Sequence, residues 1–181
     1  CNLRVLKRSM KKDEETYFKG KYKYIKNAAK DPPFMDGLYD KSVLLYAGTK
    51  YHLANSYYHT KFDYLFIDEA SQMSLTDIIA LGSITKNIVL IGDQLQLGQP
   101  TEGSHPGESG KSILDYLLED NDTISENRGI FLNRTYRLHP KINNFISPSF
   151  YDGRLLTHAN TKERKINFAK DCPINSEGIH F

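Results

Sequence analysis

The sequence predicts an α/β fold in which helices flank a parallel β-sheet. Three continuous apolar runs of strand length, rich in β-branched or aromatic residues, occur at residues 43–47, 64–67 and 88–91. Runs that do not alternate with polar residues are typical of strands covered on both faces, as in a parallel sheet. Residues 75–81 lie between the last two runs and space their leucines and isoleucines as a crossover helix does.

Composition and charge narrow the class of protein. The chain has 181 residues, 24 Lys or Arg against 22 Asp or Glu, and 39% hydrophobic residues, which describes one globular domain or two small pieces. No apolar run approaches the roughly 20 residues that cross a bilayer, so no membrane association is expected. Cys1 and Cys172 are too few for a disulfide framework, which favours a reducing intracellular compartment. Because the chain begins with Cys1 rather than methionine, we expect a fragment.

Residues 1–41 are predicted to form a basic helical segment. The first 30 residues carry ten Lys or Arg against three acidic side chains, interleaved with Tyr and Phe rings. Single-stranded nucleic acid needs cations for its phosphates and flat rings for its bases. The candidate contacts are Lys19, Lys21 and Lys23, and the alternative is a solvated helix face with a few packing tyrosines.

Each of the three predicted strands ends in residues suited to ligand binding. The three endings are Gly48-Thr49, Asp68-Glu69 and Gly92-Asp93. Ligands of open α/β sheets bind just beyond the carboxyl ends of the strands, so we expect these endings to line one site. Two neighbouring carboxylates after a buried strand are costly unless a cation compensates them. In phosphoryl transfer the first would hold magnesium and its waters and the second would act on the attacking water, whereas the alternative is that both cap the next helix.

The second half of the chain predicts helices at residues 112–118 and 141–150, with a fourth apolar run at 130–132 between them. The sequence HPGESGKS at residues 105–112 has the ending of a phosphate-binding loop. However, His105 stands where that loop requires its first glycine, and the segment follows the acidic strand instead of preceding it. We therefore expect no phosphate binding there.

Three segments together resemble motifs II, III and IV of superfamily 1 helicases. They are FDYLFIDEASQ at residues 62–72, IVLIGDQLQL at 88–97 and LNRTYRLHP at 132–140. The likeness is to the 5′-to-3′ branch that contains the nonsense-mediated decay helicase and the flap-processing nuclease-helicases. It is nearest to bacterial helicase domains joined to a RecB-like nuclease, which also carry an HPGESG-type loop and a segment like FYDGRL at residues 150–155.

This resemblance implies a partial RecA-like P-loop NTPase fold that uses ATP and Mg²⁺. It implies that Asp68 binds magnesium through water and that Glu69 acts on the hydrolytic water. It further implies a γ-phosphate contact by Gln96 and a nucleic-acid contact by Thr49. Two roles come from the second RecA-like lobe: Arg137 as an arginine finger and Tyr136 against the adenine.

The family pattern also implies boundaries. Residues 1–41 would end an insertion in lobe 1, residues 42–128 would form the second half of lobe 1, and residues 129–181 would begin lobe 2. No G-x-x-x-x-G-K-[ST] precedes Asp68, so the chain alone is expected not to hydrolyse ATP. The strands at 43–47, 64–67 and 88–91 would lie side by side, with an open edge that favours self-association. The expected location is the cytoplasm in a bacterium, and the nucleus or cytoplasm in a eukaryote.

Two other functions remain open at the level of sequence. A metal-dependent nuclease would use Asp68, Glu69 and Asp93, although adjacent residues of one strand point to opposite faces. A non-catalytic nucleic-acid binding module is the other alternative. Whether the substrate is DNA or RNA, and whether a nuclease domain is attached, stays undecided.

Overall fold

The computed structural model describes residues 5–7, 25–27, 45–59, 61–98, 103, 105–119, 121–167 and 178–179. The chain divides into two compact units. Unit 1 comprises Cys1–Asp68 and Thr76–Ile91, and unit 2 comprises Glu69–Leu75 and Gly92–Phe181. The predicted nucleic-acid contacts Lys19, Lys21 and Lys23 lie outside the described residues.

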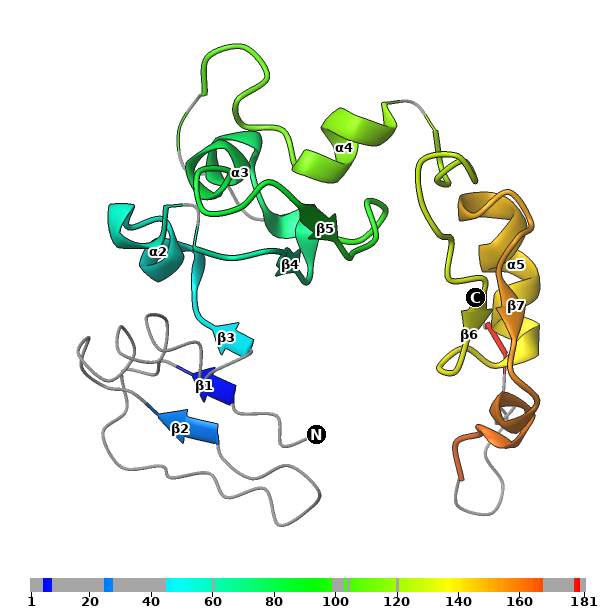
Figure 1. Cartoon of the computed structure of the whole chain (residues 1–181). Helices are drawn as coiled ribbons and strands as arrows, with labels where there is room; N and C mark the ends of the chain where they lie inside the picture. Colours follow the sequence, from blue (N-terminus) through cyan, green and yellow to red (C-terminus); the bar gives the residue numbers. More distant parts are fainter. Residues whose placement is uncertain are drawn as a thin grey trace. The chain divides into compact units, whose positions relative to one another are not determined.

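One sheet of unit 1 has three short parallel strands in the order β2-β1-β3 (Figure 1). These strands are β1 (Val5–Lys7), β2 (Ile25–Asn27) and β3 (Leu45–Ala47). The six described residues of the predicted basic helical segment therefore form strands and not helix. β3 is the first predicted strand, and its partner is β1, not the second predicted strand as the family pattern implies.

The second and third predicted strands form a parallel pair, as expected. β4 (Leu65–Ile67) pairs with β5 (Ile88–Leu90), and α3 (Leu75–Leu81) lies in the connection between them (Figure 1). The register places Leu65 opposite Ile88 and Ile67 opposite Leu90, and the amide of Ile91 donates to the carbonyl oxygen of Ile67 over 2.8 Å. The two strands thus end side by side, which confirms the α/β fold class.

The prediction that these strands are covered on both faces is wrong for β4. Leu65 and Ile67 are buried, whereas Phe66 between them is 62% exposed. Successive side chains of a strand point to opposite faces. The residues that the structure describes therefore cover one face of β4 and leave the other open.

Helix α2 (Lys50–Leu53) follows β3 directly, and the 3-10 helix η1 (Ser56–Tyr58) follows α2. An ion pair of 2.7 Å between Lys50 Nζ and Asp77 Oδ2 ties α2 to α3, with both side chains largely buried. Among the described residues of unit 1, the buried apolar side chains are Leu53, Tyr58, Leu65, Ile67, Leu81 and Ile84.

The first part of unit 2 joins the 3-10 helix η2 (Ala70–Gln72) to α4 (Ile113–Leu118), and the two elements contact each other. An antiparallel bridge between Ser74 and Ser112 brings the two chain segments together. As predicted, a helix begins after Ser112, because the Oγ of Ser112 accepts a hydrogen bond from the amide of Asp115 and caps α4.

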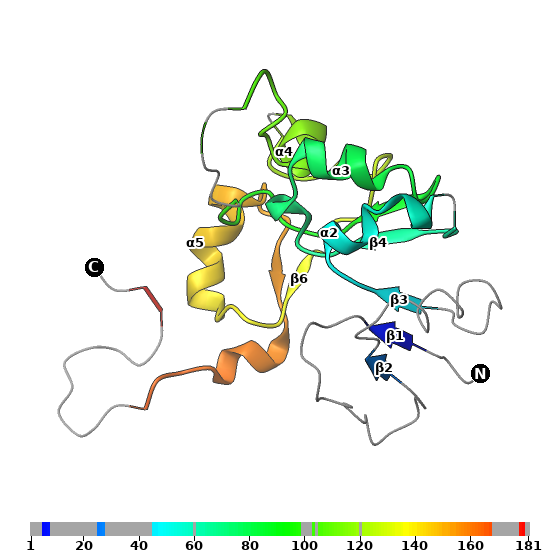
Figure 2. The same cartoon turned by 90° about the vertical axis from the view of Figure 1, so that its left-hand side faces the viewer.

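The second part of unit 2 is a β-helix-β segment. β6 (Arg134–Thr135) and β7 (Leu156–Thr157) pair in parallel, and α5 (Pro140–Phe150) connects them and contacts β7 (Figures 1 and 2). The 3-10 helix η3 (Ala159–Glu163) follows β7. α5 matches the predicted helix, whereas the fourth apolar run precedes β6 instead of forming it and leaves Ile130 and Leu132 exposed.

The compact units divide the chain differently from the predicted boundaries at residues 41 and 128. Those boundaries concern the lobes of a larger helicase core and stay predictions. In the part of the chain that the structure describes, no helix has the length and apolarity to cross a membrane.

Candidate functional site

The acidic pair lies at the end of β4, and its second residue has an unusual backbone. Asp68 follows Ile67 directly, and both carboxylates are exposed. Glu69 has φ 54° and ψ 45°, the left-handed conformation, and precedes η2. A non-glycine residue there costs about 1–3 kcal/mol and persists where the surroundings enforce it, often at functional sites.

Gly92 places the turn after β5 against the segment that follows Glu69. A Cβ atom on Gly92 would lie 2.9 Å from the nitrogen of Ala70, 3.2 Å from the nitrogen of Ser71 and 3.0 Å from Cδ1 of Leu114. The backbones therefore approach as closely as glycine permits. Within unit 2, the GDQLQL turn and the residues after the acidic pair form one contiguous site.

The carboxylate of Asp93 organises this turn. Its Oδ1 accepts from the amide of Leu95 over 3.1 Å, and its Oδ2 accepts from Gln96 Nε2 over 3.2 Å. Oδ2 also accepts from the hydroxyl of Tyr151 over 2.7 Å. Burial, the hydrogen bond to Asp93 and the negative charge of Asp93 raise the pKa of Tyr151 to about 12. Sequence reasoning did not select Tyr151, and its only signal was its place in the FYDGRL segment.

The YRLHP segment has a well-defined local structure. The Oγ1 of Thr135 accepts from the amides of Arg137 and Leu138. His139 Nδ1 accepts from the amide of Lys141, and Pro140 occupies the first turn of α5, where its missing N–H leaves no bond unmade. α5 therefore begins shortly after Tyr136 and Arg137, the two residues to which the resemblance assigns nucleotide contacts.

Those two side chains, Tyr136 and Arg137, are exposed. The ring of Tyr136 is 60% exposed and stacks on the ring of His158 with a centroid distance of 4.6 Å. A surface salt bridge would be a purely structural role for Arg137. Among the described residues, however, its guanidinium has no ion-pair partner. One face of the Tyr136 ring is held by His158, and Arg137 is accessible to a ligand.

Thr49 lies between β3 and α2 in unit 1. It takes the N-cap position of α2 in an extended conformation, with φ −78° and ψ 158°, and its hydroxyl makes no capping bond. Its carbonyl oxygen accepts from the amides of His52 and Leu53. Thr49 is exposed, and helix capping by its hydroxyl does not explain why a threonine occupies this position.

The HPGESGKS segment has a structural explanation that involves no phosphate. The amide of Ser109 donates to the carbonyl of Pro106, and the amide of Lys111 donates to the carbonyl of Glu108. Lys111 Nζ also pairs with Glu108 Oε1 over 2.6 Å. A phosphate-binding loop leaves such amides for its ligand; the absence of phosphate binding here stays a prediction.

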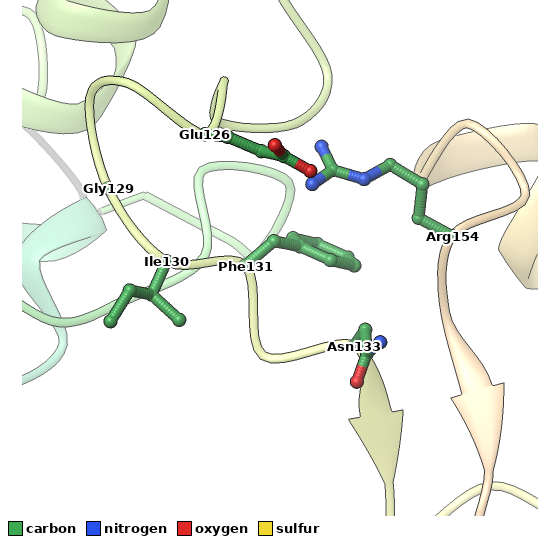
Figure 3. A pocket seen from close by; sticks show the side chains of 6 residues that line it. All are labelled: Glu126, Gly129, Ile130, Phe131, Asn133 and Arg154. Atoms are coloured by element: carbon green, nitrogen blue, oxygen red, sulfur yellow. The ribbon is translucent and has the colours of Figure 1, made fainter.

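A shallow cleft of about 470 Å³ lies beside β6 in unit 2, lined by Glu126, Gly129, Ile130, Phe131, Asn133 and Arg154 (Figure 3). The guanidinium of Arg154 lies over the Phe131 ring, 4.6 Å from its centroid. Its Nη1 donates to Thr123 Oγ1 and to the carbonyl of Ile124 over 2.6 and 2.9 Å. Figure 3 shows the Glu126 and Arg154 side chains directed toward each other above this ring. These contacts hold the 123–131 loop to the turn after α5.

The sequence-predicted residues are thus partly brought together. Asp93 and Gln96 touch each other, and Glu69 lies next in the chain to the segment that packs on Gly92. Tyr136 and Arg137 have their described contacts elsewhere in unit 2, with the His158 ring and the Thr135 hydroxyl. Within the described residues, no group of three or more His, Cys, Asp or Glu side chains is arranged to hold a metal ion.

Comparison with known proteins shows which proteins the chain is similar to. A protein family described as an AAA domain matches residues 110–181. The chain is 29% identical over 128 residues to the DNA replication ATP-dependent helicase/nuclease dna2 of Schizosaccharomyces pombe, covering 67% of this chain and 9% of that protein. It is 34% identical over 105 residues to the ATP-dependent helicase upf1 of the same yeast, covering 58% and 11%.

A third relative is the helicase SEN1 of Saccharomyces cerevisiae, which is 38% identical over 98 residues, covering 52% of this chain and 4% of that protein. The matched region is therefore about a tenth or less of the length of these relatives. The three motifs in their order, the parallel α/β fold and these similarities support a likeness of this chain to part of a superfamily 1 helicase.

Proposed function

We propose that the protein containing this chain couples Mg-ATP hydrolysis to movement along single-stranded nucleic acid. The observation that carries this proposal is the packing of Gly92 on the backbone of Ala70 and Ser71. It joins the turn that bears Asp93 and Gln96 to the segment after Glu69. A helicase requires such a junction, since the groups that act on ATP must lie near the group that senses its phosphate.

The proposed roles of the acidic pair follow from their exposure and their place after β4. Asp68 is one accessible carboxylate, which suits Mg²⁺ held through water with phosphate oxygens as further ligands. The absence of a three-residue cluster among the described residues fits this sparse kind of ligation better than it fits a nuclease site built from protein carboxylates. Bound Mg²⁺ would neutralise charge on the phosphates.

Glu69 is proposed to orient the hydrolytic water and accept its proton. Its backbone has the strained left-handed conformation, and such strain often occurs at functional residues. Gln96 is proposed to contact the γ-phosphate, because it is an exposed residue and the bond from its side-chain amide to Asp93, at 3.2 Å, is longer than the bond from Tyr151 to the same oxygen.

Arg137 and Tyr136 are proposed to act on the nucleotide from the second lobe. A guanidinium is always charged, and its planar fork suits the negative charge that develops on a transferred phosphoryl group. The exposed ring of Tyr136, fixed on one side by His158, offers its other side to an adenine base.

Nucleic-acid contact is proposed for Thr49, whose hydroxyl is not used in capping α2, and for Lys19, Lys21 and Lys23. The partner is single-stranded DNA or RNA. A RecB-like nuclease domain in the same protein and self-association through the open sheet edge are proposed as well. The 181 residues have no G-x-x-x-x-G-K-[ST] before Asp68, so this chain alone is proposed not to hydrolyse ATP.

The test is Glu69→Gln in the full-length protein that contains this chain. Nucleic-acid-stimulated ATP hydrolysis should fall by at least about 100-fold while ATP binding stays within about twofold, because the amide cannot accept the proton. Glu119→Gln is the matched control, since Glu119 is also exposed and has φ 53°, but follows α4. Retained hydrolysis in Glu69→Gln would contradict the role of Glu69.

A second variant tests the HPGESGKS segment. Lys111→Ala should leave ATP hydrolysis nearly unchanged, because its Nζ pairs with Glu108 and its loop amides bond internally. Complete loss of hydrolysis in Lys111→Ala would instead make this segment the phosphate-binding loop.

A further inference from the structure

Tyr151 makes a tertiary contact that the proposed function leaves unexplained. Its hydroxyl donates to Oδ2 of Asp93 over 2.7 Å in a partly buried setting. Asp93 opens the turn after β5, and Tyr151 is the C-cap of α5, 58 residues further along the chain. The hydrogen bond therefore links the GDQLQL turn to the FYDGRL segment within unit 2.

The same oxygen of Asp93 holds the Gln96 side chain. Oδ2 accepts from Gln96 Nε2 over 3.2 Å, while Oδ1 accepts from the amide of Leu95. An ionised carboxylate oxygen accepts more than one donor, so Gln96 and Tyr151 share it. The amide of Leu95 fixes the carboxylate from inside the turn, and the hydroxyl of Tyr151 fixes it from a distant segment.

We propose that Tyr151 is a positioning residue that holds the Asp93 carboxylate in place while the Gln96 amide exchanges between Asp93 and a nucleotide phosphate. This rests on the proposed function, in which Gln96 contacts the γ-phosphate. When Gln96 leaves Asp93, Oδ2 keeps its shorter bond to Tyr151. The partly buried Oδ2 therefore keeps one donor after Gln96 has left. This lowers the free-energy cost of releasing the Gln96 amide.

The state of the phenol suits this role. Burial and the interactions with Asp93 raise the pKa of Tyr151 to about 12, so the hydroxyl keeps its proton and stays a donor at neutral pH. The Tyr151 ring also lies 6.2 Å from the Phe131 ring, centroid to centroid, so the ring has packing contacts that do not depend on the hydroxyl.

The test measures nucleic-acid-stimulated ATP hydrolysis of the full-length protein with Tyr151→Phe, which removes the hydroxyl and keeps the ring. We expect kcat to fall about tenfold while KM for ATP changes less than about twofold, because the bond acts on Gln96 and not on overall nucleotide binding. Tyr116→Phe is the matched control: Tyr116 is an exposed tyrosine of α4 in the same unit, and both kinetic constants should stay unchanged.

A double-mutant cycle separates positioning from a loss of stability. In a Gln96→Ala background, Tyr151→Phe should change kcat by less than about twofold, since the Asp93 carboxylate that Tyr151 holds no longer has a Gln96 amide to bind. An equal loss in both backgrounds, or a Tyr151→Phe protein that behaves like Tyr116→Phe, overturns the proposal. Glu69→Gln keeps the two proposals apart: hydrolysis that survives it contradicts the proposed role of Glu69 in ATP hydrolysis. Hydrolysis that collapses in Glu69→Gln but is normal in Tyr151→Phe refutes only the role of Tyr151.

Discussion

The backbone nitrogen of Ala70 lies 2.9 Å from the position that a Cβ atom on Gly92 would occupy. Gly92→Ala must therefore push apart the two segments that form the candidate site, and we expect it to destabilise the chain by about 1–3 kcal/mol. Urea unfolding of the 181-residue chain measures this loss. Gly98→Ala is the control, because nothing lies within 4 Å of its Cβ position. Equal stability of the two variants would contradict the close packing.

The left-handed backbone of Glu69 predicts an inverted order of stability for two substitutions. Glu69→Gly and Glu69→Ala both remove the side chain, but only glycine adopts φ 54° without strain. We expect Glu69→Gly to be more stable than Glu69→Ala by about 1 kcal/mol. At Asp115, in the first turn of α4, the order should be the ordinary one, with glycine less stable than alanine by about 1 kcal/mol. Thermal unfolding of the four variants checks both orders.

Two ion pairs of similar length should differ in their effect on stability. Lys50 and Asp77 are 2.7 Å apart with side chains 19% and 23% exposed, whereas Lys111 and Glu108 are 2.6 Å apart with side chains 54% and 56% exposed. Asp77→Ala leaves a largely buried cation without this partner and should cost about 1–3 kcal/mol. Glu108→Ala should stay within about 0.5 kcal/mol, because water and salt screen the exposed pair. A cost for Glu108→Ala as large as that for Asp77→Ala would contradict the prediction.

The raised pKa of Tyr151 predicts a pH dependence in the alkaline range. Folding favours the protonated phenol, since its pKa rises from 10.0 to about 12 through burial and through the hydrogen bond and charge of Asp93. The stabilisation is therefore fully present below about pH 10 and is lost as the pH rises toward about 12.

The difference in unfolding free energy between the wild-type chain and Tyr151→Phe, followed against pH, measures this loss. The difference should be constant up to about pH 10 and change above it. In a phenolate absorbance titration, Asp93→Asn should lower the pKa of Tyr151 but leave the part that burial contributes. A wild-type chain with no tyrosine titrating near pH 12 would refute the contact.

Local pattern was sufficient to predict strands β3, β4 and β5 and helices α3, α4 and α5, but not strands β1 and β2. The apolar runs at residues 64–67 and 88–91 contain β4 and β5, because β-branched and aromatic residues favour strands. The helix starts were also readable, since Ser112 and the His139-Pro140 pair satisfy or remove the first amides of α4 and α5. The chemical identity of the candidate site, Asp68-Glu69 followed by Asp93 and Gln96, came from the same local motifs.

Other features depended on how distant segments meet. The pairing of β3 with β1 and the exposure of Phe66 were not predicted, because the partner of a strand and the cover of a sheet face are set by the path of the chain. The hydrogen bond between Tyr151 and Asp93 joins residues that no periodicity relates.

By itself, the sequence determined the α/β class, the likeness to superfamily 1 helicases and the candidate residues of the site, since each of these is recorded in residue type and short-range spacing. Only the tertiary structure decided the left-handed backbone of Glu69, the contact of Gly92 with Ala70 and the shared carboxylate oxygen of Asp93. The physical reason is that close approach and backbone strain arise when separate segments pack against one another, and local propensities do not contain that information.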